Sequence, residues 1–326
     1  MINRYDDLKI ENEAGYDSYL ENIFKIIKDH VGDSGVLLGL SGGVDSSVCA
    51  ALLATVLPGK VHCIFVDHGL MRKNEGDEVE KAFKNFELNI VRVNAEERFL
   101  DKLAGIIEPE EKRKIIGHEF IRLFEEEASK LAGVEYLAQG TIFADVSESG
   151  KDGKALIKSH HNVGGLPQNM NFKGIVEPFR SLTKSQVRVL GCKLGLPSSL
   201  TDRPPFPGPG LAVRCIGELT KDRLDTLREV DSIFCKELEA AGFKADQYFA
   251  VLTNLNTVGI KNDAREYGSV VALRAVSTED FMTAGFCKIP YELLDKVSQR
   301  ITTEVPGICR VVYDITSKPP STIEWE

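Results

Sequence analysis

The stretch VLLGLSGGVDSSVCAALLATVL, residues 36–57, decides the fold of this chain. Its apolar start, residues 36–40, predicts a buried strand, and the segment from about Ser46 onward predicts a helix. Two glycines, three serines and one aspartate lie between and at the start of that helix. A strand, a tight turn and a helix N-terminus in this order predict an anion site, because the first N–H groups of a helix are free and carry partial positive charge.

Three further apolar runs, each separated by a helix-length segment, look like strands buried on both faces: residues 61–66, 90–93 and 134–138. This alternation predicts an α/β fold with a doubly wound parallel sheet, in which ligands bind beyond the carboxyl ends of the strands. Polar residues and glycines follow three of these strands: residues 41–47, 67–69 and 139–141. The candidate site is therefore expected at this edge of the sheet.

Capping residues predict where two of the helices begin. Apolar residues at helical spacing between residues 16 and 27 predict a first helix, with Asp17 or Ser18 as its cap. Thr183 and Gln186 are spaced as a capping box for a later helix.

The run DRPPFPGPG, residues 202–210, separates two parts of the chain. Four prolines exclude a helix or a central strand, so this run is a linker or a stiff wall beside a site. The segments after it are a strand-like LAVRCI (211–216), a long helix (224–238), two strands (248–253 and 269–276), a helix opened by Pro290 and a last strand (308–315). We expect a first domain at residues 1–203 and a smaller α+β domain at residues 204–326.

The composition narrows the class of protein. Forty Lys and Arg against forty-nine Asp and Glu give a net charge of −9, which disfavours a broad nucleic-acid interface. Seven cysteines without a CxxC pair favour a reducing compartment over a disulfide framework or zinc ribbon. No apolar leader and no membrane span is evident, so we expect a cytoplasmic protein that binds neither membrane nor nucleic acid.

The turn after the first strand lacks the lysine and the spacing of a Walker A motif. It has instead the composition of an anion nest, formed by Ser41, Gly42, Gly43, Val44, Asp45, Ser46 and Ser47. Asp45 is repulsive toward phosphate, so it either caps helix N–H groups or holds a Mg²⁺ ion that neutralises the phosphates. The alternative is a plain glycine-rich turn with an aspartate cap.

SGGVDSS, residues 41–47, resembles the PP-loop of the N-type ATP pyrophosphatases, which cleave ATP between its α- and β-phosphates. Other stretches resemble the synthetase part of one branch, the GMP synthase family: EKRKIIG (111–117), LAQGTIFADVSES (137–149), KSHHNVGGLP (158–167), PFPGPGLAVR (205–214), ALRAV with DFMT (272–276 and 280–283), and RVVYDITSKPPSTIEWE (310–326). The resemblance runs from the PP-loop to the last residue of the chain.

The resemblance implies an adenine nucleotide alpha hydrolase-like sheet and a second domain that pairs two subunits. It also implies a ligase reaction that uses ATP and Mg²⁺. The O2 atom of XMP attacks the α-phosphorus, pyrophosphate leaves, and ammonia then displaces AMP from C2 to give GMP. Asp45 and Lys158 are implied as catalytic residues, with Asp45 as the Mg²⁺ ligand.

The same resemblance assigns XMP-binding roles to Arg113, Asp263, Arg265, Lys318, Ile323 and Glu324. Lys112 and Lys114, beside Arg113, suit a lid over the nucleotides, although a solvated basic turn of a helix is the alternative. At the end of the chain, Trp325 is expected to anchor the tail by burying its indole. His160 and His161 are adjacent, so their side chains diverge and a zinc site is not predicted.

The complete family enzyme also carries a glutaminase domain, for which the stretch before Ser41 is too short. We therefore expect a synthetase subunit or part of a two-domain enzyme, a homodimer supplied with ammonia by a separate glutaminase or by free ammonium. Cys49 and Cys63 are expected to be small buried hydrophobes. Two alternative functions remain. One is a tRNA-modifying enzyme with the same PP-loop, which would need a basic face for RNA, and the other is a nucleotide-binding regulatory subunit without catalysis.

Overall fold

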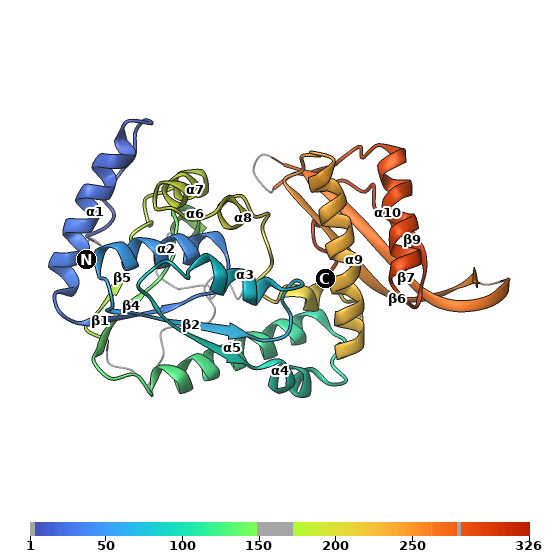
Figure 1. Cartoon of the computed structure of the whole chain (residues 1–326), viewed down its shortest axis with the longest axis horizontal. Helices are drawn as coiled ribbons and strands as arrows, with labels where there is room; N and C mark the ends of the chain where they lie inside the picture. The colour runs from blue at the N-terminus through green and yellow to red at the C-terminus, as the bar shows by residue number, and fades with distance from the viewer. Residues whose placement is uncertain (1–3, 149–171, 262, 279–281) are drawn as a thin grey trace. The chain divides into compact units, whose positions relative to one another are not determined.

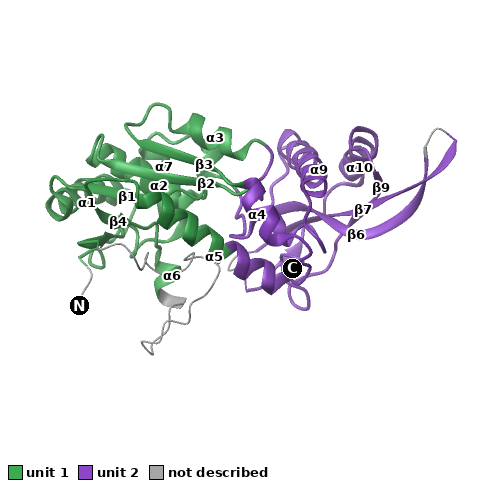
Figure 2. Ribbon diagram, turned by 90° about the horizontal axis from the view of Figure 1, so that it is seen from below, with its two compact units in different colours: residues 1–68, 74–95, 117–203 green, residues 69–73, 96–116, 204–326 purple. Residues whose placement is uncertain are grey.

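The computed structural model describes residues 4–148, 172–261, 263–278 and 282–326, and the chain divides into two units (Figure 2). Unit 1 comprises Met1–His68, Asn74–Ala95 and Gly117–Arg203. Unit 2 comprises Gly69–Lys73, Glu96–Ile116 and Pro204–Glu326. The last change of unit falls inside the proline-rich run, and two earlier segments join the second unit. An ATP role for one unit and an XMP role for the other stay predictions.

Unit 1 is built on a five-stranded parallel sheet with the order β3-β2-β1-β4-β5. Its strands are β1 (Gly35–Gly39), β2 (Val61–Asp67), β3 (Asn89–Asn94), β4 (Val134–Ala138) and β5 (Gly174–Val176). The predicted doubly wound α/β fold and its four predicted strands are confirmed. The sequence pattern does not predict β5, because three residues give too little periodicity.

Helices cover both faces of this sheet. They are α1 (Gly15–Val31), α2 (Val44–Val56), α3 (Glu75–Ala82), α6 (Phe143–Glu148), α7 (Lys184–Lys193), α8 (Ser198–Thr201) and the second part of α5 (Pro109–Ala128). Figure 1 shows α2 and α5 on opposite faces. Most of α2 is buried, which explains its apolar residues on all sides.

One of the two predicted helix starts is confirmed. Thr183 is the N-cap of α7, and both hydrogen bonds of the capping box with Gln186 are present. The first predicted helix is present, but its predicted cap was wrong, because α1 begins at Gly15 with Ala14 in the N-cap position. Asp17 lies instead in the first turn, where its negative charge interacts favourably with the positive end of the helix dipole.

Unit 2 is an α+β structure, as predicted. Its elements are α4 (Glu96–Leu103), the start of α5, a 3₁₀ helix η1 (Gly210–Val213), α9 (Lys221–Ala240), β6 (Gln247–Lys261), β7 (Ala264–Ser277), β8 (Gly285–Phe286), α10 (Tyr291–Glu304) and β9 (Ile308–Tyr313). The antiparallel run β6-β7-β8 is extended by β9, which pairs with β7 in parallel. Figures 1 and 2 show α9 and α10 on one face of this sheet.

The strand predicted for residues 211–216 was wrong. Gly210, at φ +63°, starts a tight turn, and Leu211 donates its N–H to the carbonyl of Leu70. Only an isolated bridge between Cys215 and Leu252 has strand geometry. The segment is apolar because it is buried in the 3₁₀ helix η1 and the stretch after it, which a short apolar run does not distinguish from a strand.

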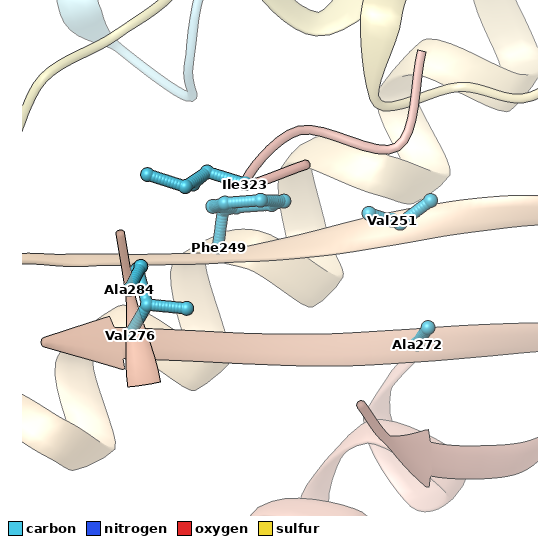
Figure 3. Close-up of a cluster of buried hydrophobic side chains, with 6 residues drawn as sticks. All are labelled: Phe249, Val251, Ala272, Val276, Ala284 and Ile323. Carbon is cyan, nitrogen blue, oxygen red and sulfur yellow. The ribbon is translucent and has the colours of Figure 1, made fainter. Parts of the chain in front are cut away.

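The C-terminal tail packs on the sheet of unit 2. Ile323 joins a buried cluster whose other members are Phe249, Val251, Ala272, Val276 and Ala284 (Figure 3). The ring of Tyr248 contacts Phe234 of α9, so Phe249, the next residue of the strand, faces the opposite side. The tail and α9 therefore cover opposite faces of β6.

None of the helices in the described part of the chain has both the length and the apolar composition of a membrane span.

Candidate active site

The PP-loop candidate, residues 41–47, lies where the strand order of unit 1 reverses. The chain runs from β1 to β2 and β3 on one side, and β4 and β5 lie on the other side of β1. The loop after β1 and the segment after β4 therefore meet at the switch point, where ligands of such sheets bind. A Cβ atom on Gly140, after β4, would lie 2.9 Å from the carbonyl carbon of Asp45.

Two serine hydroxyl groups shape the loop from within. The Oγ atoms of Ser41 and Ser46 lie 2.9 Å apart, and Ser46 Oγ donates to the carbonyl of Gly43 at 3.2 Å. Ser41 Oγ accepts from the N–H of Gly43 at 3.4 Å. Gly42 adopts φ +78°, a conformation that favours glycine. The loop is thus held in a tight turn by its own side chains.

Two buried polar atoms at the start of α2, Asp45 Oδ1 and Ser47 Oγ, have no hydrogen-bond partner in the described part of the chain. Buried polar atoms are satisfied in most proteins, so two unsatisfied atoms in one turn fit the predicted ligand site. The helix begins at Val44 and has no side-chain cap, so the alternative that Asp45 caps it was wrong. Asp45 Oδ2 accepts instead from Lys184 Nζ.

Two residues at the loop, Lys184 and Arg203, are not predicted by the sequence. Lys184 is the first residue of α7, directly after the cap, so the capping box predicts its place on a helix but not its contact with Asp45. Arg203 Nη1 lies 2.6 Å from Glu75 Oε1 and 3.4 Å from the carbonyl oxygen of Gly42. Both side chains of this ion pair are nearly buried, at 10% and 3% exposed. Arg203 thereby ties the proline-rich run to the loop.

Residues after β4 contribute structure to the switch point. Thr141 donates to Glu177 Oε1 at 2.7 Å, and the carboxylate of Asp145 accepts from the N–H of Ile142 at 2.9 Å. A direct ligand role for Thr141 stays a prediction. Lys158, like His160 and His161, lies outside the described residues.

The chemistry of Asp45 fits the Mg²⁺ ion that the resemblance implies. Mg²⁺ is usually held by one or two carboxylates together with phosphate oxygens of the substrate. Asp45 Oδ1 is a carboxylate oxygen without a partner, in a loop of free helical N–H groups. No cluster of three or more acidic, His or Cys residues suited to a metal occurs among the described residues. A Mg²⁺ ion held by Asp45 would take its other ligands from phosphate and water.

The six residues with predicted XMP roles all lie in unit 2. Arg113 is in the first part of α5, mostly buried, and paired with Glu110. The prediction that Lys112 suits a lid was wrong, because its side chain is 0% exposed and hydrogen bonded inside the unit. Neighbouring residues of a helix point in different directions, so Lys112 faces the interior although it lies in a basic stretch.

Two buried arginines hold the tail that carries three of these six residues. Arg214 donates Nε and Nη2 to the two carboxylate oxygens of Glu324, at 3.0 and 2.8 Å. Arg274 donates to the carbonyl oxygens of Ile323 and Thr322, at 2.7 and 2.9 Å.

The prediction that Trp325 is buried was wrong. Trp325 is 40% exposed, and its indole N–H donates to Asp314. Buried cations, rather than an indole, order the tail.

Asp263 and Arg265 lie at the other end of the sheet. Lys261 at the end of β6 pairs with Ala264 at the start of β7, so Asp263 lies at the turn of this hairpin. Asp263 has φ +59°, a left-handed conformation that Asp tolerates better than most residues. The structure does not bring this hairpin end to the tail of the same chain.

Cys49 and Cys63 are fully buried, as predicted. Burial raises the pKa of both thiols, so neither is poised as a nucleophile.

Gly140→Ala tests the close contact between the β4 segment and the loop. The new Cβ would lie within 3.1 Å of three backbone atoms of Asp45 and Ser46, so the loop must shift. We expect a loss of about 1–3 kcal/mol in stability, measured by denaturant unfolding. Gly117→Ala in α5 is the matched control, because its Cβ meets nothing within 4 Å and alanine favours a helix. A Gly140→Ala variant as stable as the unchanged protein would contradict the contact.

Comparison with known proteins gives two family matches and several similar chains. A family model described as NAD synthase matches residues 19–113, and one described as GMP synthase C terminal domain matches residues 236–325. Proteins named GMP synthase [glutamine-hydrolyzing] are 61% identical over 311 residues in Treponema denticola, 58% over 324 in Finegoldia magna and 58% over 312 in Ruminiclostridium cellulolyticum.

These three alignments cover 95%, 99% and 95% of this chain, but 60%, 64% and 61% of the relatives. The chain thus spans about 60% of the length of the curated relatives that it matches. A solved structure of NMN synthetase from Francisella tularensis is 18% identical, with a TM-score of 0.43 over 60% of this chain and 77% of that one. That likeness is too low to support an argument.

Proposed function

The chain is homologous to the synthetase portion of GMP synthases, and on that premise we propose that it makes GMP from XMP, ATP and ammonia. The observation that carries this proposal is an identity of 54–61% that runs through both units. The GMP synthase model matches in unit 2, the unit that holds the six candidate XMP residues. The NAD synthase model matches around the PP-loop, where an ATP pyrophosphatase needs its phosphate site.

In the proposed first step, the loop of residues 41–47 binds the β- and γ-phosphates of ATP. Its free N–H groups and the positive end of α2 stabilise the negative charge that develops on pyrophosphate as it leaves. The O2 atom of XMP forms a bond to the α-phosphorus while the bond from that phosphorus to pyrophosphate breaks. Ser47 Oγ, buried without a partner, is placed to donate to a phosphate oxygen.

In the second step, ammonia attacks C2 of the adenylated purine, AMP leaves with the O2 atom, and loss of a proton gives the amino group of GMP. Adenylation matters because oxygen on a purine ring is otherwise a poor leaving group. A bound Mg²⁺ ion would neutralise phosphate charge, and Asp45 would hold it through Oδ1. Lys184 would keep the other oxygen of that carboxylate in place.

The proposed XMP site lies at the tail of unit 2. Lys318 offers a point charge for the nucleotide phosphate, and Arg113 a second cation. Glu324 is already held by Arg214 and by Gln247, which donates at 2.8 Å, so its carboxylate is fixed before a ligand arrives. A carboxylate fixed in this way accepts a hydrogen bond at a lower entropic cost.

We expect the site to be completed by the hairpin of a second copy. The tail meets β6 at Gln247, whereas Arg265 pairs with Ile260 near the far end of that strand. Thirteen residues of extended strand span roughly 40 Å, far beyond the reach of two side chains across one nucleotide. A dimer lets the hairpin of one subunit reach the tail of its partner. Exposed apolar side chains on the distal hairpin support such pairing: Leu255, Val258, Ile260 and Tyr267.

The partner for ammonia supply and the cellular setting belong to the same proposal. The relatives are named as glutamine-hydrolysing, so we propose that ammonia comes from a glutaminase on a separate subunit or from free ammonium. All seven cysteines are free thiols in the structure, which suits a reducing cytoplasm.

The test is formation of GMP by the purified 326-residue chain. With XMP, ATP and Mg²⁺, we expect ammonium chloride to support release of one AMP and one pyrophosphate for each GMP, measured by chromatography of the nucleotides. Glutamine in place of ammonium should give no GMP above background. GMP formation from glutamine by the chain alone would contradict the separate glutaminase, and no turnover with ammonium would refute the proposed activity.

A further inference from the structure

Lys112 is a fully buried ammonium group that connects separate parts of unit 2. It lies in α5 directly before Arg113, and its side chain is 0% exposed. Its Nζ donates to Glu326 Oε2 at 2.6 Å and to the carbonyl oxygens of Cys215 and Ala212 at 3.1 and 3.3 Å. An ammonium has three N–H donors, so these three acceptors use all of them.

Both carboxylate oxygens of Glu326 also have hydrogen-bond partners. Its side chain is 8% exposed, and its second oxygen, Oε1, accepts from the N–H of Gly217 at 3.4 Å. Neither Lys112 nor Glu326 therefore offers a group to a substrate. Any influence of this pair on binding must pass through the segments that it joins.

The pair joins three segments that bear on the proposed XMP site. One is the start of α5, with Arg113. Another is the tail, with Glu324 two residues before Glu326. The third is the segment 212–215. Its carbonyl groups accept hydrogen bonds from Lys112, and its Arg214 donates to Glu324. Arg214 is itself fixed, since it is 0% exposed and its Cζ lies 4.0 Å from the centroid of the Phe249 ring.

We infer that the Lys112–Glu326 ion pair is a positioning pair for XMP: it locks the tail to the helix that carries Arg113, so that both halves of the nucleotide site are aligned before XMP binds. The inference rests on the proposed function, which assigns Arg113 and Glu324 to XMP. Groups that are fixed in advance lose less entropy on binding, so the lock should act on XMP affinity. It should leave the ATP loop untouched, since residues 41–47 belong to the other unit.

Steady-state kinetics of Glu326→Gln test the lock. We expect the KM for XMP to rise about tenfold or more, as for loss of a hydrogen bond between charged groups, while kcat and the KM for ATP stay within about twofold. The midpoint of thermal unfolding should fall, because a buried ammonium has lost its counter-charge.

The double variant Lys112→Met/Glu326→Gln separates positioning from stability. Removing both charges from a buried pair costs far less than removing one, so the unfolding midpoint should recover most of its loss. The tether stays broken, so the KM for XMP should remain about tenfold raised. This variant also carries the test if Glu326→Gln alone does not fold.

Glu237→Gln is the matched control in the same unit. Glu237 is nearly buried and bonds Lys296 at 2.6 Å and Arg300 at 2.8 Å, which ties α9 to α10 away from the tail. It should lower the unfolding midpoint without changing the KM for XMP. Recovery of both stability and XMP affinity in the double variant would overturn the inference, as would an unchanged KM in Glu326→Gln. Calorimetric titration of XMP into the unchanged protein distinguishes the two levels: no binding there would refute the proposed function itself.

Discussion

Asp45→Asn is expected to lower the rate of pyrophosphate release by about 10²–10³-fold, because a metal-bound phosphate loses several kcal/mol of charge stabilisation. The substitution keeps the shape of the side chain but removes the charge that would hold Mg²⁺ at Oδ1. It also weakens the contact of Oδ2 with Lys184. The rate is measured with ATP and XMP in the absence of ammonia, so that only adenylation is followed.

The fold should survive this substitution. The side chains of Asp45 and Lys184 are 25% and 42% exposed, and partly exposed ion pairs contribute little to stability. Asp17→Asn is the matched control: it breaks an aspartate–lysine pair with Lys193, at the opposite end of the same helix α7. That variant should adenylate XMP at the unchanged rate. A near-normal rate in Asp45→Asn would show that the carboxylate only shapes the loop.

The parallel sheet and the position of the PP-loop were predictable from sequence, because both depend on local patterns. Apolar runs separated by helix-length segments give the strands, and glycine, serine and aspartate after the first strand give the loop. The chain order then places the loop at the switch point. What the pattern left open was the partner of Asp45, since Lys184 lies 139 residues away in the chain.

Contacts in the tail were less predictable because they too join residues that are far apart in the chain. Lys112 and Glu326 are 214 residues apart, and a charged residue in a basic stretch of helix is usually solvated. Nothing local distinguishes Lys112, which is buried, from a lysine that faces solvent. Similarly, LAVRCI has the apolar character of a strand, but the glycine before it forces a turn. Burial driven by distant partners therefore accounts for both of these errors.

Arg265 and Lys318 provide the second large effect, because they are expected to act on one XMP molecule from different subunits. Arg265→Ala and Lys318→Ala should each reduce activity at low XMP by about 10–100-fold, as for loss of a hydrogen bond to a charged group. Mixing the two variants under conditions that exchange subunits makes half of the dimers mixed. In a mixed dimer one site carries both changes and the other carries neither.

Half of the sites in half of the dimers are then intact, so the mixture should recover about one quarter of the unchanged activity. Lys318→Ala mixed with Glu324→Gln is the matched control, because both changes lie on the tail and every site of a mixed dimer keeps one of them. That mixture should stay as inactive as its components. Recovery in the first mixture alone requires that hairpin and tail come from different subunits, as the roughly 40 Å of strand between them demands. If the first mixture also stays inactive, Arg265 does not serve the partner's site and the dimeric XMP site is refuted.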